Sequence, residues 1–269
     1  MLLRSVAMKP SASLPHQFPF TLPFVKPDLA IAFDAPVTLL VGDNGSGKST
    51  FLEALACAIG ASTIGSASVL NDPTLAAVRV FAEHLKLVWS KRTRRGFFLR
   101  SEDFFGFAKQ MIQIQADMRQ ELQTIEKTYQ NRSPLARSLA ELPYRNELGA
   151  MQRAYGESLD HYSHGEAFFR LFQERLTGEG VYLLDEPEAP LSPTRQLAFL
   201  TLLKQAIERN GQCIIATHSP ILMAYPNATI LLFEGDTIRR VAYDEVEHVS
   251  LTRAFLNDPQ RYLHHLLAD

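Results

Sequence analysis

One short segment constrains the fold of this 269-residue chain more than any other. It reads Gly42-Asp43-Asn44-Gly45-Ser46-Gly47-Lys48-Ser49, matches the pattern G-x-x-x-x-G-K-[ST], and is followed directly by Thr50. The wholly apolar, β-prone run 37–41 precedes it, and a helical pattern begins at Ser49 and is stopped by Gly60. A strand, a glycine-rich loop and a helix in this order present consecutive backbone N–H groups to phosphate oxygens.

The chemistry of this loop predicts a bound nucleoside triphosphate. The first turn of the helix adds the positive end of its dipole to the phosphate site. We expect Lys48 to reach the β- and γ-phosphates and Ser49 Oγ to bind Mg²⁺, so ATP and Mg²⁺ are the predicted cofactors. The alternative is a chance glycine-rich turn, but such a turn does not require both the strand before it and the helix after it.

A second apolar run, 181–184, ends in Asp185-Glu186. A parallel strand beside the first would carry both carboxylates to the carboxyl edge of the sheet, next to the phosphates. We expect Asp185 to hold Mg²⁺ through its water shell and Glu186 to accept a proton from the attacking water. The alternative is a solvated strand end, because Asp and Glu often terminate buried strands.

The order of the remaining patterns predicts an α/β fold with a mostly parallel sheet covered by helices on both faces. Residues 11–27, rich in Pro and Phe, suggest short edge strands and turns, and the polar stretch 131–155 suggests weakly ordered chain. We expect a single domain, 1–269, with an inserted helical subdomain at about 103–165. The expected strands are 37–41, 85–90, 97–100, 181–184, 213–217 and 228–233, and the expected helices are 49–59, 72–84, 104–130, 165–178, 193–209 and 248–267.

Three further segments resemble motifs of the ABC-type ATPases. One of them precedes the apolar run 181–184, where that family has its signature. It reads Tyr162-Ser163-His164-Gly165-Glu166 and keeps the Ser-x-Gly core. Ala216-Thr217-His218-Ser219 resembles the switch-histidine loop, and the segment 186–193 resembles the loop that crosses between subunits. The resemblance implies a P-loop NTPase fold of the ABC type, with an inserted helical lobe and antiparallel N-terminal strands.

The same resemblance implies a shared active site. Ser163, Gly165 and Glu166 of one subunit would cap the γ-phosphate bound to the other, so hydrolysis would require an ATP-dependent homodimer. His218 would contact the γ-phosphate and steady the attacking water together with Glu186. Taken locally, Ser163 could instead be a helix N-cap and His218 a capped strand end.

Departures from the family pattern favour soluble ATPases of the SMC/RecF-like class over transporter subunits. The signature has His164 and Glu166 where transporter subunits usually have Gly and Gln, and Phe168 and Phe169 replace small residues. No counterpart of the family's glutamine loop is located, since Gln110, Gln113 and Gln115 lie in a helical run and the preceding strand ends in Arg100-Ser101-Glu102. The interval from Lys48 to Asp185 is too short for long coiled-coil arms.

Composition indicates a soluble, cytoplasmic protein without direct membrane insertion. Hydrophobic residues make up 46% and charged residues 21%, and no apolar run approaches the roughly 20 residues of a membrane-spanning helix. Cys57 and Cys213 have no disulfide or zinc spacing. A net charge of −2 makes the whole chain no attractor of nucleic acid, so such binding would need a local patch.

Lys91, Arg92, Arg94 and Arg95 form such a patch, with Trp89, Phe97 and Phe98 interleaved. Three interpretations remain open: a solvated hairpin tip with its aromatics in the core, a contact with DNA or RNA, and a contact with nucleotide or an acidic partner. The pairs His161/His164 and His264/His265 lack accompanying Cys or carboxylate ligands, and we do not expect them to bind metal.

Three functions fit the sequence. The first is a soluble ATPase whose ATP-driven dimerisation acts on a protein partner or nucleic acid, with DNA maintenance or defence as examples. The second is the ATP-binding subunit of a membrane ABC transporter. The third is an ATP-binding switch with very slow turnover.

Overall fold

The centre of the protein is a six-stranded sheet with the order β5-β6-β7-β3-β8-β9. The computed structural model describes residues 1–10, 14–64, 68–155 and 164–267. The first five strands of this order are parallel, whereas β9 runs antiparallel to β8. Every residue of β3 and β7 is buried, as expected for strands covered on both faces. The strands are β3 (Val37–Gly42), β5 (Gly96–Arg100), β6 (Val181–Asp185), β7 (Gln212–Ala216), β8 (Thr229–Glu234) and β9 (Thr237–Val241).

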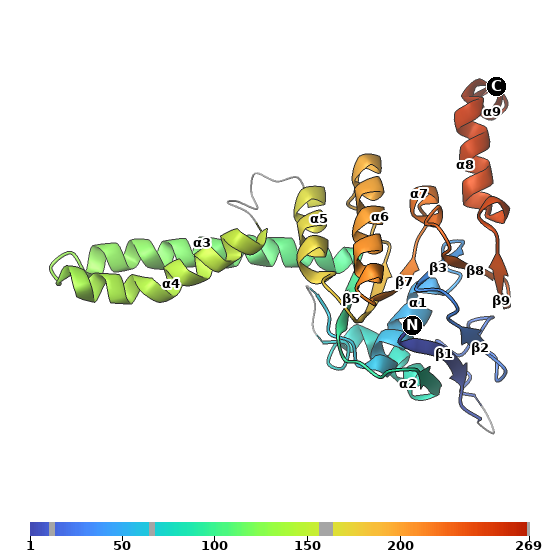
Figure 1. Cartoon of the computed structure of the whole chain (residues 1–269), viewed down its shortest axis with the longest axis horizontal. Coiled ribbons are helices and arrows are strands. Elements are labelled where there is room, and N and C mark those ends of the chain that lie inside the picture. Colours follow the sequence, from blue (N-terminus) through green and yellow to red (C-terminus); the bar gives the residue numbers. More distant parts are fainter. Residues whose placement is uncertain (11–13, 65–67, 156–163, 268–269) are drawn as a thin grey trace.

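Helices cover both faces of this sheet (Figure 1). On one face α1 packs against β3, β6 and β7, and α2 packs on α1. On the other face α5 and α6 form a second core, in which Phe168, Phe172 and Phe199 are fully buried. The alternation of strands and helices thus gives the expected layered fold. The helices are α1 (Lys48–Ile59), η1 (Pro73–Leu75), α2 (Ala76–Glu83), α5 (His164–Arg175), α6 (Pro193–Glu208) and α7 (Pro220–Met223).

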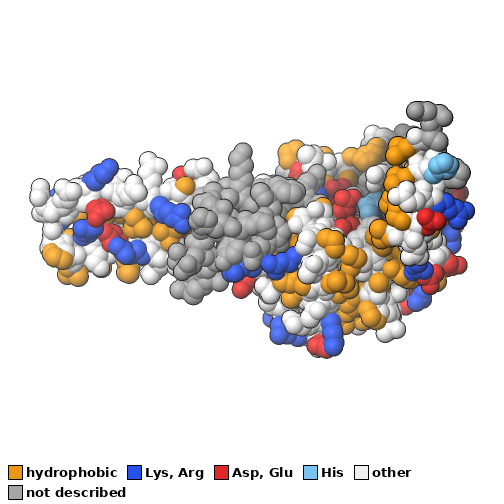
Figure 2. Space-filling view, turned by 90° about the horizontal axis from the view of Figure 1, so that it is seen from above, with side chains coloured by type: hydrophobic (Ala, Val, Ile, Leu, Met, Phe, Trp, Pro, Cys, Tyr) orange, Lys and Arg blue, Asp and Glu red, His pale blue; other side chains and the backbone are white. Residues whose placement is uncertain are grey.

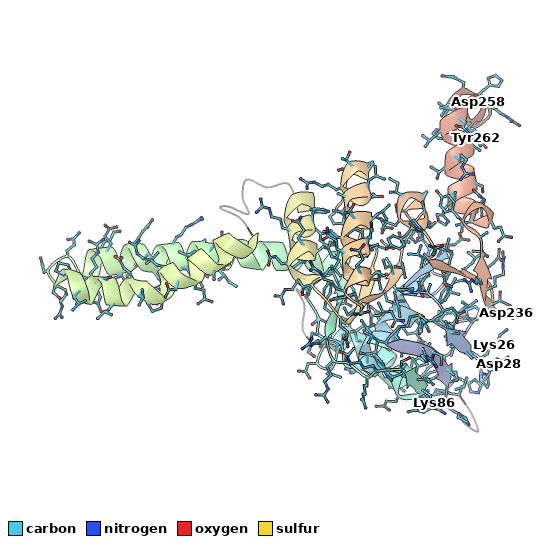
Figure 3. The ribbon with its side chains drawn as sticks, viewed as in Figure 1. Lys26, Asp28, Lys86, Asp236, Asp258 and Tyr262 are labelled. Atoms are coloured by element: carbon cyan, nitrogen blue, oxygen red, sulfur yellow. The ribbon has the colours of Figure 1, made fainter. Side chains whose placement is uncertain are left out.

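A smaller antiparallel sheet with the order β2-β1-β4 lies beside α1 and α2. It contains β1 (Leu3–Met8), β2 (Ala30–Ala32) and β4 (Leu85–Trp89). Residues 14–27 form turns rather than the expected edge strands, because the antiparallel pairing is made by the segments on either side. Lys26 from this region pairs with Asp236 in the β8–β9 turn at 2.5 Å (Figure 3).

The basic segment is not a hairpin tip. Its flanking strands belong to different sheets, since β4 pairs with β1 and β5 pairs with β6. The expectation of two strands joined as a hairpin was therefore wrong, and residues 91–95 are a crossover between the sheets. Proximity in sequence suggested a hairpin, but the pairing was decided by which strands bury their apolar faces.

Two long helices, α3 (Ser101–Thr128) and α4 (Pro134–Tyr155), pack against each other and project from the core as an arm (Figure 1). The expectation of weakly ordered chain at 131–155 was wrong. Arg137 pairs with Glu141 one turn along α4 at 2.8 Å and with Glu126 of α3 at 2.9 Å. Such pairs and the packing on α3 stabilise a helix whose own apolar periodicity is weak.

The C-terminal segment forms two helices instead of the single expected one. They are α8 (Glu247–Asn257) and α9 (Pro259–Leu267), preceded by the turn η2 (Tyr243–Glu245). Asp258 lies between them with φ −147 and ψ 74, because Pro259 disfavours helical geometry in the residue before it. In the described part of the chain, none of the helices combines the length and apolar character needed to cross a membrane.

Candidate active site

The glycine-rich loop joins β3 to α1 as its sequence predicts. Gly42 has φ 144, and a Cβ there would lie 2.4 Å from the carbonyl oxygen of Phe233. Gly47 has φ 90 at the N-cap of α1, where a Cβ would lie 2.5 Å from the ring of Phe24. Both positions therefore require glycine. The first turn of an α-helix has N–H groups without partners inside the helix, so the start of α1 suits an anion.

Lys48 lies across this loop. Its Nζ donates to the carbonyl oxygens of Gly42 and Asp43, each at 2.8 Å, and to Ser46 Oγ at 3.3 Å. Burial lowers the pKa of the Lys48 ammonium, although Glu186, Asp185 and Asp43 act in the opposite direction. A cation held at the mouth of a phosphate loop is placed to neutralise a triphosphate.

Ser49 and Asp185, which are 136 positions apart in the sequence, are brought together. Ser49 Oγ donates to Asp185 Oδ1 at 3.1 Å, because α1 packs on the end of β6. Burial raises the pKa of the Asp185 carboxyl to about 7. A hydroxyl and a carboxylate oxygen side by side, next to a phosphate loop, are oxygen ligands of the kind that Mg²⁺ prefers. These two residues would hold the ion.

Glu186 has an unusual backbone. Its φ is 48, and its N–H donates to the carbonyl oxygen of Ala216 at 2.9 Å. A left-handed non-glycine residue costs on the order of 1–3 kcal/mol and is most often found at functional sites. The turn directs the half-exposed carboxylate toward His218, whose Nε2 lies 3.8 Å from Glu186 Oε1.

His218 follows β7 and contacts two residues that the sequence did not identify as functional. Its backbone N–H donates to Glu188 Oε1 at 2.7 Å, and its ring Nδ1 lies 3.1 Å from His248 Nε2. Burial, Lys48 and His248 lower the pKa of His218, and burial raises the pKa of Glu188. Glu188 could have been found from its place in the loop after Glu186. No local pattern points to His248, which comes from α8.

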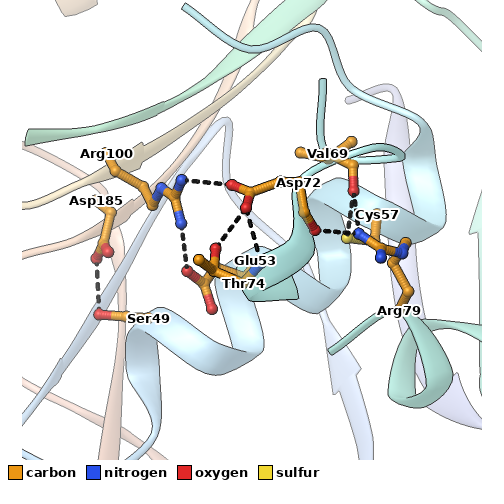
Figure 4. A network of polar contacts seen from close by, with 9 residues as sticks. All are labelled: Ser49, Glu53, Cys57, Val69, Asp72, Thr74, Arg79, Arg100 and Asp185. Atoms are coloured by element: carbon orange, nitrogen blue, oxygen red, sulfur yellow. Dashed lines mark hydrogen bonds and ion pairs between the residues drawn. The ribbon is translucent and has the colours of Figure 1, made fainter. Parts of the chain in front are cut away.

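Arg100 ends β5 directly beside Asp185 and ties the arm to the phosphate loop helix (Figure 4). Its guanidinium donates to Asp72 Oδ2 at 3.0 Å and to Glu53 Oε1 at 3.3 Å. Glu53 lies one turn after Ser49 in α1, and α3 begins at the residue after Arg100. Hydrogen bonds from Thr74 and Arg100 lower the pKa of Asp72. Arg100, beside Asp185, thus links the end of β5 to Glu53 and Asp72.

The other residues predicted for the site lie in the outer part of the phosphate loop, in α1 and in α5. Asn44 and Gly45 form the outer part of the loop, and Thr50 is half-buried in α1. Gly165 and Glu166 lie in the first turn of α5, whereas Ser163 lies outside the described residues. The last residues of α5, Glu174 and Arg175, line a pocket with Arg95 and Gly96 at the amino-terminal end of β5, so the first turn of α5 lies toward the carboxyl edge of the sheet.

The basic residues are not part of this site. The segment 91–95 enters the amino-terminal end of β5, at the sheet edge opposite Asp185. Lys91 pairs with Glu179 at 2.5 Å. The segment therefore lies away from the phosphate loop of the same chain, and its interpretation as a contact with nucleotide or an acidic partner stays a prediction.

The face above the carboxyl edge is hollowed and acidic. Figure 2 shows acidic side chains and a histidine gathered between apolar surfaces on this face. A cleft of about 340 Å³ lies beside the loop and is lined by residues 42–46, the β8–β9 turn and the start of α8, including His248.

Comparison with known proteins agrees with this geometry. A family model described as "AAA domain" matches residues 22–136, and one described as "AAA domain, putative AbiEii toxin, Type IV TA system" matches residues 167–224. None of the curated proteins matches the chain.

Solved structures similar to the chain include SMC head domains and ATP-binding proteins of ABC transporters. The Smc head domain from Pyrococcus furiosus is 11% identical, covers 96% of this chain and 99% of its own, and has a TM-score of 0.46. The SMC head domain from Thermotoga maritima is 14% identical, with coverages of 90% and 98% and a TM-score of 0.40. CbiO1 from Clostridium perfringens, part of an ABC transporter complex, is 17% identical, with coverages of 90% and 91% and a TM-score of 0.42. The first match covers the phosphate loop and the second covers the Asp185-Glu186 strand end, so both parts of the site lie in segments that resemble AAA domains.

Proposed function

We propose that the protein binds ATP with Mg²⁺ and hydrolyses it, and that ATP joins two copies of the chain. The observation that carries the proposal is the convergence of Ser49, Asp185 and Glu186 beside Lys48. These residues come from α1, from the end of β6 and from the position after it, and they supply the charge, the metal ligands and the base that phosphoryl transfer needs.

Each side chain has one task in this proposal. The N–H groups of residues 43–49 and Lys48 bind the phosphates. Ser49 and Asp185 hold Mg²⁺, which supplies charge neutralisation at the phosphates when bound. Glu186 accepts the proton of the attacking water, and His218 orients that water and the γ-phosphate, as the 3.8 Å contact between the two side chains supports.

The shared site rests on the position of α5. Its first turn carries Gly165 and lies at the same sheet edge as Asp185. We infer that Ser163, Gly165 and Glu166 of a second copy cap the γ-phosphate, as the resemblance to ABC-type ATPases implies. The division into one ATPase unit with a helical subdomain at about 103–165, and a cytoplasmic location, belong to the same proposal.

The process that ATP hydrolysis by the dimer drives is the least specified part of the proposal. We favour an action on a protein partner or nucleic acid, and the description of the second family model, a putative toxin of a toxin–antitoxin system, supports a role in defence. A transporter subunit and a slow nucleotide switch are the competing outcomes of the test below.

The test is ATP binding and turnover with wild-type protein, Lys48→Ala, and Lys204→Ala as a control on the exposed face of α6. We expect Mg²⁺-dependent hydrolysis by the wild type, abolished by a chelator, and a fall of roughly 100-fold or more in kcat/KM for Lys48→Ala. Unchanged binding and turnover in that variant would refute the phosphate-loop assignment. Tight ATP binding without measurable turnover would favour the switch. Stimulation by DNA would favour the nucleic-acid role, and stimulation only by a membrane permease the transporter.

A further inference from the structure

A second histidine contacts the proposed water-orienting histidine. His248 Nε2 lies 3.1 Å from His218 Nδ1, within hydrogen-bonding distance, and the two rings are 5.1 Å apart with an interplanar angle of 53°. His248 belongs to the first turn of α8, whereas His218 follows β7. The contact therefore joins the C-terminal helices to the site.

The base of α8 is firmly placed. Val246 and Val249, on either side of His248, are buried in the core under α6 and α7. The Tyr243 hydroxyl donates to the carbonyl oxygen of Pro220 at 3.2 Å, which ties the turn before α8 to α7. His248 is half-buried, and these packed residues fix the position of its backbone. The histidine pair is thus held by the fold.

A hydrogen bond between two ring nitrogens uses one proton, so one ring donates and the other accepts. If His218 donated from Nδ1, its neutral ring would present a lone pair at Nε2 toward the carboxylate oxygen of Glu186, 3.8 Å away. If His248 donates instead, His218 carries its proton on Nε2 and presents a donor to Glu186. The second arrangement avoids opposing two lone pairs, and the geometry therefore favours His248 as the donor.

The charges around the pair are consistent with this assignment. His218 faces Lys48, Asp43 and Glu186, and burial together with Lys48 lowers its pKa, which favours a neutral ring with one proton. On the other side, the cleft next to His248 is lined by Glu245, Glu247 and Arg239. A neutral His218 has two tautomers, and its partners at the two ring nitrogens, His248 at Nδ1 and Glu186 at Nε2, both favour the one with the proton on Nε2.

We propose that His248 is a positioning residue for ATP hydrolysis: its Nε2–H donates to His218 Nδ1 and fixes His218 with its proton on Nε2, toward Glu186 and the reacting phosphate. The inference rests on the proposed function only for its effect on turnover. The tautomer of His218 is a property of the nucleotide-free protein.

The first measurement is the pair of ¹⁵N ring shifts of His218 in nucleotide-free protein, for the wild type, His248→Phe and His248→Gln. We expect the wild type to carry the proton on Nε2. His248→Phe keeps a ring but has no donor, so His218 should become a mixture of tautomers. His248→Gln places an amide N–H near the same point and should restore the wild-type form. His264→Phe, in α9 of the same helical pair, is the control and should leave the shifts of His218 unchanged.

The second measurement is steady-state ATP hydrolysis by the same variants. His248→Phe should lower kcat by roughly 10–100-fold, the usual effect of losing a partner that orients a functional histidine, with little change in KM. His248→Gln should recover most of that loss, which a merely structural defect would not allow.

The outcomes distinguish the inference about the His218 tautomer from the proposed ATP hydrolysis. A wild-type His218 protonated on Nδ1, or shifts that do not respond to His248→Phe, would overturn the inference whatever the activity. A wild-type protein with the expected tautomer but no hydrolysis would overturn the proposed function and leave the positioning of His218 supported. If His248→Phe failed to fold, the wild-type shifts and His248→Gln would still decide.

Discussion

Asp185 shows the conflict between folding and function at the scale of a single residue. It is partly enclosed at the end of β6, near Glu186, Glu53 and Glu188, and burial raises the pKa of its carboxyl to about 7. An ion bound by Ser49 and Asp185 would remove this conflict by supplying positive charge. Without the ion, the charged form of Asp185 destabilises the folded state.

We therefore expect Asp185→Asn to stabilise the metal- and nucleotide-free protein at high pH. A carboxyl whose pKa is raised in the folded state stabilises the fold fully below its ordinary pKa, and this contribution is lost as pH rises through about 7. The gain in melting temperature should be small at pH 5 and reach about 2–4 °C at pH 8, which corresponds to roughly 1 kcal/mol. Thermal melts at both pH values measure it. An equal gain at the two values would contradict a raised pKa.

Residues whose role depends on a local motif were predictable, and residues placed by tertiary packing were not. Lys48, Ser49 and Asp185 follow strands at fixed spacing, so their convergence at one sheet edge follows from parallel topology. Arg100 reaches the site because α1 packs on β6. His248 reaches it because α8 packs on α7. No periodicity or spacing in the sequence records these contacts.

Among the elements, β5 shows how one glycine fixes the junction between two sheets. Gly96 begins β5 with φ 112, and a Cβ there would lie 1.9 Å from the carbonyl oxygen of Val181 in β6. The strand can pair with β6 from its first residue only because this position lacks a side chain.

Gly96→Ala should accordingly destabilise the protein by at least about 2 kcal/mol, because it combines a strained backbone with a clash against an adjacent strand. Gly235→Ala is a matched control, since Gly235 has a positive φ of 56 but its Cβ would meet no atom within 4 Å. Denaturant unfolding of the two variants separates the clash from the backbone strain. Equal losses would show that β5 and β6 are not paired in the register Gly96–Val181.

The basic segment between β4 and β5 gives the second prediction at this scale. If residues 91–95 bind nucleic acid, Arg94→Glu with Arg95→Glu should weaken binding, and the salt dependence should flatten in proportion to the number of phosphates that these two arginines neutralise. Lys127→Glu with Arg132→Glu, at the tip of the arm, makes the same change in net charge and is the control. Fluorescence anisotropy at several salt concentrations measures both. Equal losses of affinity would indicate a non-specific charge effect, and no binding by the wild type would leave the segment solvated.

The core elements were predictable because their apolar runs are short, continuous and bounded by glycine, proline or caps. Of the two helices of the arm, α3 was predicted and α4 was not. The helix α3 has apolar residues at spacings of three and four, but α4 depends on α3 and on ion pairs such as Arg137–Glu141. The break at Asp258, between α8 and α9, was missed although Pro259 marks it (Figure 3 labels Asp258).

At the scale of the whole molecule, the question is what completes the site. The carboxyl edge of the sheet gathers Lys48, Asp185, Glu186 and His218, and the first turn of α5 opens onto the same edge. We propose that this edge binds the ligand from one side. A second copy of the chain, bringing its own Gly165 to the γ-phosphate, would enclose it, and this is the reason to expect ATP to control assembly.

Glu186→Gln tests that expectation. The amide keeps the shape of the side chain but cannot accept a proton, so ATP should still bind while hydrolysis falls by about 10²–10⁴-fold. Stalled ATP should then hold two subunits together, and the variant should elute as a dimer with ATP but as a monomer with ADP. Adding Ser163→Arg places bulk and positive charge where the γ-phosphate of the other subunit must dock. This double variant should still bind ATP in its own loop and yet return to the monomer. A Glu186→Gln protein that remains monomeric with ATP at micromolar concentration would mean that the site is completed within one chain or by an unrelated partner, and the roles assigned to Ser163 and Gly165 would then fail while those of Lys48 and Asp185 would not.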